Sequence, residues 1–264
     1  MTLTSFILLI LAFFLTSVVG VVTGSNSLIT VPLMFQFGID EKITVATNMF
    51  GLTFMAIGGT IPFVRRGNIE VRRLRPLIAV TVIGSALGAA LVGLITNEAI
   101  KLIVIGAMVA IVIFVCWSGD RRPAGETVID DPAIAESLAN PRSRMSYAGV
   151  ASAFLLAIYG GLYSGGYVTI LTATLVAFTG MSFGQSVAAT KLINVFSSGI
   201  ATLVFMWQGL VDYSLGIILA ITMFFGAYIG AHYAARMNET WLRRIFLITV
   251  LLLAAKMLVD LVSS

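Results

Sequence analysis

The sequence predicts an all-α, polytopic membrane protein made of two inverted-topology repeats, and three observations lead to this class. Hydrophobic residues make up 59% of the 264 residues and charged residues only 11%, which is far outside the range of soluble domains. Several apolar runs reach the ~20 residues that a membrane-spanning helix needs. Three short motifs recur in the same order in both halves of the chain. None of the long runs alternates polar and apolar residues, which argues against a membrane β-barrel.

Ten apolar segments are expected to form the helices. They span residues 3–22, 27–38, 43–64, 76–96 and 99–117 in the first half, and 147–163, 167–181, 185–208, 212–235 and 239–262 in the second. The interval between the two sets holds three of the six prolines and nine charges, which is typical of a solvated linker. We therefore divide the chain into a first membrane repeat (1–118), a cytoplasmic linker (119–145) and a second membrane repeat (146–264).

The repeat is visible in three pairs of motifs. The stretch GVVTGSN from Gly20 corresponds to GLYSGGY from Gly161, VATNMF (45–50) to AATKLI (188–193), and GSALGA (84–89) to GAYIGA (226–231). Each match is weak alone, because Gly-x-x-x-Gly is common wherever membrane helices pack closely. Three matches in one order predict an internal duplication.

The arginines predict the orientation of these segments. They gather in the loop at 65–75, on both sides of the linker, and at 236–244. If all three regions are cytoplasmic, every arginine lies inside, as the positive-inside rule requires. Corresponding segments must then cross in opposite senses, with both termini outside. We expect a multi-pass protein of the bacterial inner membrane.

The short second segment of each half follows a polar break, at residues 23–27 and 163–167. Twelve helical residues cover only ~18 Å of a ~30 Å hydrocarbon core. Non-helical backbone at that depth is tolerated where it is buried in protein or lines an aqueous cavity, and paired breaks mark the substrate site of inverted-repeat transporters. The free N–H groups that start each following half-helix suit an anion. The alternative is that the glycines only allow close helix packing.

Lys191 is the most informative charged residue, because a charge inside a membrane segment usually faces a cavity or a partner. Asn194 and Ser198 share its helical face, which favours a polar cavity, although a lysine can also snorkel to the interface. Asn48 occupies the equivalent position in the first half. The predicted substrate-binding residues are Gly24, Ser25, Asn26, Thr47, Asn48, Ser164, Gly165, Gly166, Thr190, Lys191 and Asn194.

Several chemistries are not expected. The sequence has no phosphate loop, no HExxH motif, no paired histidines and no carboxylate pair within one span, so we expect neither an enzyme nor a metal or cofactor site. The single cysteine, Cys116, excludes an intrachain disulfide. Membrane topology explains the basic pI better than nucleic-acid binding does. His232 could take part in proton coupling, but an interfacial position explains this histidine more simply.

At these motifs the sequence resembles the sulfite exporter TauE/SafE family of membrane transporters, over nearly the whole chain. The resemblance rests on the bend followed by LITVPLM with Pro32, on VATN, and on AATKLINVFSSGIATLVFMWQGLVDY. It implies a cell-membrane carrier of small anions, often sulfite or organosulfur compounds such as sulfonates. The two bends depart from the family pattern, since the first reads Gly-Ser-Asn and the second, YSGGY, lacks the usual proline-containing form.

The predicted function is secondary transport of a small anion, sulfite or an organosulfur anion such as a sulfonate, by alternating access around a midplane site. A passive anion channel and a non-transporting membrane scaffold subunit remain alternatives. The expected partners are the anion and the lipid bilayer, without nucleic acid. Homo-oligomer formation, the coupling ion and the direction of transport stay open.

Overall fold

The computed structural model describes residues 3–24, 26–65, 71–119, 147–179 and 181–234, together with Arg236, Trp241 and Arg244. These residues form helices joined by short connections, without a β-strand among them. The helices are α1 (Leu3–Thr23), α2 (Ser27–Gln36), α3 (Glu41–Arg65), α4 (Val71–Leu94), α5 (Asn97–Gly119), α7 (Tyr147–Leu162), α8 (Tyr167–Thr179), α9 (Phe183–Trp207) and α10 (Tyr213–Ala234).

The predicted all-α membrane fold is confirmed. Within the described residues, four helices are long and apolar enough to cross a bilayer: Glu41–Arg65, Leu74–Leu94, Phe183–Trp207 and Tyr213–Ala234. The predicted segments coincide with the helices to within about five residues at either end. Apart from Trp241 and Arg244, the predicted segment 239–262 lies outside the described residues, and so does all of the linker except Gly119. The proposed domain boundaries therefore stay predictions.

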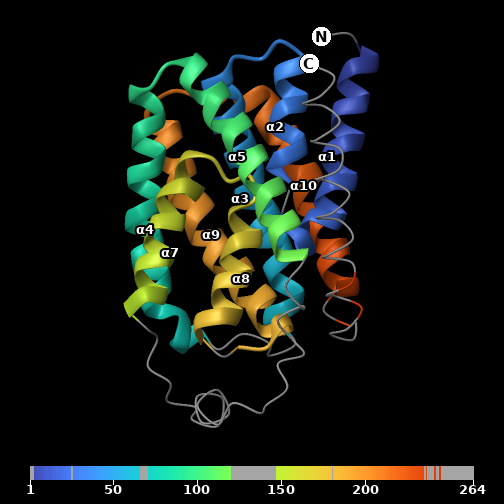
Figure 1. Cartoon of the computed structure of the whole chain (residues 1–264). Helices are drawn as coiled ribbons and strands as arrows, with labels where there is room; N and C mark the ends of the chain where they lie inside the picture. The colour runs from blue at the N-terminus through green and yellow to red at the C-terminus, as the bar shows by residue number, and fades with distance from the viewer. Residues whose placement is uncertain are drawn as a thin grey trace, which may run out of the picture.

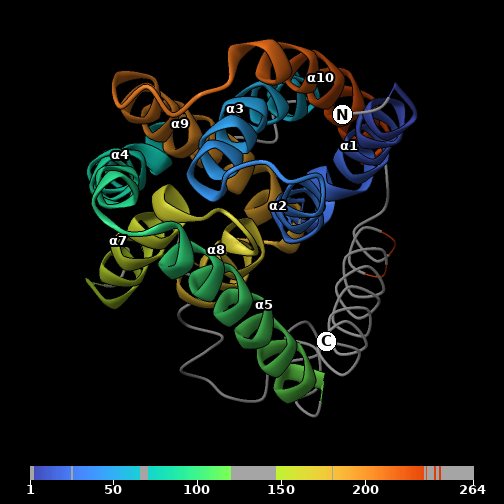
Figure 2. The same cartoon turned by 90° about the horizontal axis from the view of Figure 1, so that it is seen from above.

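The helices stand side by side in an upright bundle (Figure 1). Helix α3 packs against α9 and α10, while α9 also packs against α4 (Figure 2). At the periphery, helices from different halves of the chain pack on each other: α4 packs on α7, and α10 packs on α1. Each half therefore completes its packing on the other half.

These two peripheral contacts, α4 on α7 and α10 on α1, are made at the Gly-x-x-x-Gly motifs that recur in the two halves of the sequence. A Cβ atom at Gly88 in α4 would overlap the backbone oxygen of Ile158 in α7. A Cβ atom at Gly230 in α10 would overlap the backbone oxygen of Val18 in α1. The absence of side chains at these positions lets the helix backbones touch.

We expect Gly88→Leu to lower the thermal stability of the detergent-purified protein strongly. Its side chain would force α4 away from α7, and overpacking of this kind costs about 1–3 kcal/mol or more. Gly106→Leu is the matched control, because a Cβ atom at Gly106 in α5 meets no other atom within 4 Å. Equal melting temperatures for the two variants would show that the contact between α4 and α7 does not limit stability.

The helix boundaries follow the spacing of the sequence motifs. Helices α3 and α9 both contain 25 residues, and both their first and their last residues are 142 positions apart. Helices α4 and α10 also begin 142 positions apart. This spacing agrees with the predicted internal repeat, whereas the inverted orientation of the two halves stays a prediction.

The two short helices begin at sharp bends. With 10 residues in α2 and 13 in α8, they are about 15 and 20 Å long, less than a hydrocarbon core of ~30 Å. Gly24 before α2 has φ +72° and Gly166 before α8 has φ +76°. Only glycine adopts this left-handed backbone at little cost, so both bends depend on it. The bend between α7 and α8 lies inside the bundle, away from both its ends (Figure 1).

Candidate functional site

A small cavity lies where the two bends meet. Its volume of about 20 Å³ leaves room for about one water molecule. Residues from α1, α2, α3, α8 and α9, and from the connections that precede α2 and α8, form its wall. They are Gly20, Val21, Gly24, Asn26, Ser27, Leu52, Met55, Ala56, Ser164, Val168, Lys191 and Asn194.

Hydrogen bonds connect the two bends beside this cavity. The hydroxyl oxygens of Ser27 and Ser164 lie 2.8 Å apart and are hydrogen-bonded. The Asn48 amide nitrogen donates to the Ser27 hydroxyl at 2.9 Å, and its amide oxygen accepts from the Thr30 hydroxyl at 2.8 Å. The Tyr163 hydroxyl donates to the backbone oxygen of Ser27 at 3.1 Å. This network holds the start of α2 close to the start of α8.

Asn26 contributes unused hydrogen-bonding capacity to the cavity wall. The residue is 3% exposed, and neither its amide nitrogen nor its amide oxygen has a hydrogen-bond partner within the described part of the chain. It is also the N-cap residue of α2, but its side chain does not cap the helix. A buried polar group left unpaired costs about 1–3 kcal/mol. A water molecule or a ligand in the cavity would remove this cost.

Lys191 is the one charged residue in the cavity wall. It follows the first residue of α9 by about 12 Å along the helix axis, and it is 3% exposed. Such burial does not fit the alternative that its side chain snorkels to the interface. Within the described residues no carboxylate forms an ion pair with it, since the ion pair found there joins Lys101 and Glu41 at 2.6 Å. An unpaired buried charge is costly, so the site favours a negatively charged partner.

The structure brings together five of the predicted site residues in one wall: Gly24, Asn26, Ser164, Lys191 and Asn194. Asn48 lies behind the wall and reaches it through its hydrogen bond to Ser27.

The other predicted residues lie elsewhere. Thr190 donates to the backbone oxygen of Ser186 at 2.7 Å, outside the wall. The Thr47 hydroxyl accepts a hydrogen bond of 3.0 Å from the backbone nitrogen of Asp212, just before α10. Gly165 and Gly166 form the second bend without lining the cavity, and Ser25 lies outside the described residues.

The glycines of the bends also serve packing, the alternative that the sequence left open. A Cβ atom at Gly24 would lie 2.5 Å from the Cβ of Val168, and one at Gly165 would overlap the ring of Tyr163. Close packing and cavity lining coincide at Gly24, because the contact with Val168 brings the first bend against α8. The two roles are therefore not exclusive.

Sequence reasoning missed part of the wall. Ser27 belongs to the first polar break but was not among the predicted site residues. Leu52, Met55 and Ala56 follow Asn48 by four, seven and eight residues in α3 and line the cavity. That spacing places them on the face of Asn48, a signal available in the sequence.

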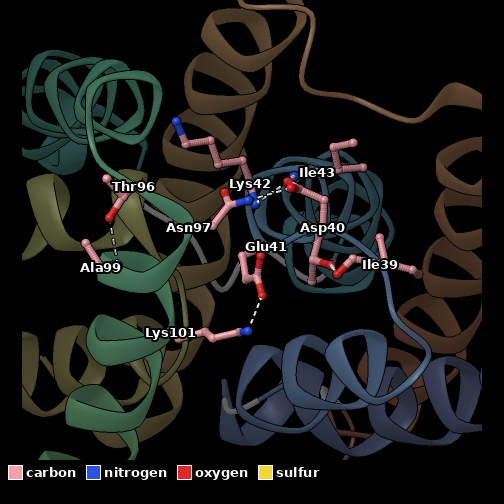
Figure 3. Close-up of polar contacts among 10 residues, drawn as sticks. Ile39, Asp40, Glu41, Lys42, Ile43, Thr96, Asn97, Ala99 and Lys101 are labelled. Carbon is pink, nitrogen blue, oxygen red and sulfur yellow. Dashed lines mark hydrogen bonds and ion pairs between the residues drawn. The ribbon is translucent and has the colours of Figure 1, made fainter.

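A larger, open recess of about 600 Å³ lies at the end of the bundle where α3 and α5 begin. One oxygen of Asp40 accepts hydrogen bonds from the backbone nitrogens of Lys42 and Ile43 at 2.9 and 3.2 Å, and thereby caps α3. Its other oxygen accepts from the Asn97 amide at 2.5 Å (Figure 3). The recess contains both Lys42 and carboxylates, so it is not selective for anions.

Comparison with known proteins identifies similar chains. The sulfite exporter TauE/SafE family matches residues 9–257. A probable membrane transporter protein, ORF9, of Sinorhizobium sp is 23% identical over 252 residues, which cover 96% of this chain and 92% of that protein. A probable membrane transporter protein of Haemophilus influenzae is 22% identical over 94% of this chain and 92% of its own. The probable membrane transporter protein YfcA of Escherichia coli K12 is 23% identical over 90% and 84%. No solved structure matches the chain.

Proposed function

The chain belongs to the sulfite exporter TauE/SafE family and is a multi-pass membrane transporter, and we propose that it is a secondary carrier for a small anion. The proposed cargo is sulfite or an organosulfur anion such as a sulfonate. It would bind in the cavity between the two bends, near the membrane midplane, and reach either side by alternating access.

The observation that carries this proposal is the buried Lys191 beside the Asn26 amide. Within the described residues, the lysine forms no ion pair and the amide has no hydrogen-bond partner. A sulfonate or sulfite group presents oxygen acceptors and negative charge, which match an ammonium, an amide N–H and the Ser27 and Ser164 hydroxyls. The half-helices α2 and α8 both begin beside this point, where the partial positive charge of a helix N-terminus also favours an anion.

The size of the cavity favours a carrier over a channel. An open channel needs a continuous water-filled path, whereas this cavity has room for about one water molecule. It is also smaller than a sulfonate group, so the cavity must widen before the cargo enters. A scaffold subunit has no need of a buried lysine or of paired helix breaks.

The repeat suggests how the site could open to either side. Helices α9 and α10 begin 142 positions after α3 and α4, and helices from different halves pack on each other at the periphery. If the halves are inverted, as the arginine distribution predicts, each can adopt the conformation of the other. Such an exchange moves the opening from one side of the membrane to the other.

Counter-flow in proteoliposomes tests this function. Vesicles with the purified protein are loaded with one unlabelled anion, and uptake of the same anion in radiolabelled form is followed. The panel comprises sulfite, thiosulfate, methanesulfonate and acetate. A carrier accumulates label transiently above its equilibrium level, because internal anion returns the site to the outside. Uptake that only equilibrates would support a channel, and uptake equal to that of protein-free vesicles would support a scaffold.

Cysteine labelling of cells tests the proposed orientation. In a Cys116→Ser background, we expect Arg72→Cys and Arg122→Cys to be protected from an impermeant thiol reagent added outside, because arginine-rich loops stay cytoplasmic. Asp40→Cys should be labelled. Permeabilised cells, in which all three variants should react, provide the control. Labelling of Arg72→Cys and Asp40→Cys from the same side would contradict the inverted-repeat model.

A further inference from the structure

We infer that the anion is transported together with one proton, which the side-chain amine of Lys191 accepts and releases. The inference rests on the proposed function of the same cavity and adds the ion that drives transport. It rests on a buried amine, a cavity wall with no other charged side chain among the described residues, and a cavity with room for about one water molecule.

Among the described residues, no acidic side chain reaches the cavity around Lys191. The eleven other residues of its wall are uncharged. Among the helices that pack on α9, the described acidic residue is Glu41, which lies at the end of α3 and pairs with Lys101. The hydroxyl of Tyr163 donates to Ser27, and that of Tyr159 to the backbone oxygen of Gly165. Neither tyrosine hydroxyl therefore carries a charge that could balance an ammonium.

Other titratable groups on neighbouring helices are remote from the cavity wall. Lys42 and Arg65 lie near the two ends of α3, and Arg75 is exposed near the start of α4. Tyr167, at the start of α8, is buried outside the wall. The charge balance of the cavity therefore depends on Lys191 and on what binds beside it.

This arrangement couples two binding events. An ammonium without an anion costs several kcal/mol in a dry site, and an anion without an ammonium costs a similar amount. When both are present, the pair is neutral and the opposite charges attract each other at short range. Anion and proton therefore favour each other's binding, and linkage makes this effect reciprocal.

Lys191 carries one proton across with each anion. On the entry side a proton from water forms an N–H bond with the lone pair of the neutral amine, and the anion binds the resulting ammonium. After the site opens to the other side, that N–H bond breaks and the proton leaves with the anion. One proton and one monoanion cross together without net movement of charge, and the amine returns empty and neutral.

Calorimetry of anion binding measures the proton directly. Methanesulfonate and ethanesulfonate are suitable probes, because each stays a monoanion and releases no proton of its own. Binding heats are measured in buffers of different ionisation enthalpy, at several pH values between about 6 and about 9. The slope against buffer enthalpy gives the protons taken up for each anion. We expect it to rise towards one with increasing pH.

Matched variants separate the inference from the proposed function. Lys191→Arg retains a permanent charge, so it should bind the anion without proton uptake. His232→Gln removes a histidine that stacks on Tyr228 outside the cavity wall, and should keep the proton uptake of the original protein. Binding without proton uptake at every pH would overturn the inference and leave the carrier proposal intact. Absence of binding by sulfite, thiosulfate and the sulfonates alike would overturn both.

Proteoliposomes that contain a pH-sensitive dye provide a second test, which does not need the Lys191→Arg variant to fold. An inward methanesulfonate gradient should acidify the lumen, with the membrane potential clamped and unclamped alike. Acidification that disappears when a potassium ionophore clamps the potential would show that the anion crosses alone, as net charge, with protons following passively, and would contradict coupling. Lys101→Gln, which removes an exposed lysine, should leave acidification unchanged.

Discussion

Lys191→Gln is expected to weaken anion binding roughly tenfold to hundredfold. Glutamine keeps much of the length and polarity of lysine but removes its positive charge. A hydrogen bond to a charged group contributes ~1.5–3 kcal/mol, which corresponds to this range in the dissociation constant. Calorimetric titration of the detergent-purified protein with methanesulfonate and sulfite measures the change.

The same substitution should leave thermal stability almost unchanged or raise it slightly. The lysine is 3% exposed and forms no ion pair within the described residues, so its removal leaves no partner charge unpaired. Lys42→Gln is the control, because that lysine lies at the open recess and donates to the backbone oxygen of Gly93 at 3.3 Å. Unchanged affinity in Lys191→Gln would remove Lys191 from the binding site and with it the charge on which the carrier proposal depends.

Gly24→Ala should abolish transport and lower the melting temperature. The residue has φ +72°, which strains alanine by about 1–2 kcal/mol, and the new Cβ would lie 2.5 Å from that of Val168. The side chain would push the first bend away from α8 and separate the Ser27 and Ser164 hydroxyls. Counter-flow and thermal unfolding of the purified variant measure the two effects.

Gly38→Ala separates strain from steric overlap. Gly38 has φ +74°, close to that of Gly24, but a Cβ atom there meets nothing within 4 Å. Its substitution should cost the strain alone and preserve transport. We expect Gly165→Val and Gly166→Val to abolish transport, because both alter the second bend. If Gly24→Ala and Gly38→Ala behave alike, contact between the bends is not needed for transport.

Apolar runs predicted where the helices lie, but local polar contacts decided where they begin. Helix α9 starts at Phe183, two residues before the predicted segment, because Ser182 and Gln185 form a capping box. Helix α4 starts at Val71, five residues before the predicted start at Pro76. The prediction followed apolar residues, and the first turn of α4 contains arginines. A bilayer limits the apolar length of a helix, whereas caps and charged turns extend it into water.

Two features of the sequence predicted the site: the depth of Lys191 within its apolar segment and the breaks in the helices. The direction in which each side chain points could not be predicted. The paired breaks and the position of Lys191 indicated residues that the structure places in one wall. Thr47 and Asn48 are neighbours in the sequence, yet a helix turns by about 100° per residue, so only Asn48 faces Ser27. The repeat alignment identified both positions but contained no information on which face each side chain occupies.

The packing of helices from one half on helices from the other also determines the order in which the protein can fold. Helix α1 packs on α10, and roughly 190 residues separate the end of the first from the start of the second. At a synthesis rate of 5–20 residues per second, α1 waits roughly 10–40 s in the bilayer before its partner exists. Its contact surface, which includes the buried Ser17 against Gly226, faces lipid or an insertion factor during that time. Assembly of this contact is therefore a late event in folding.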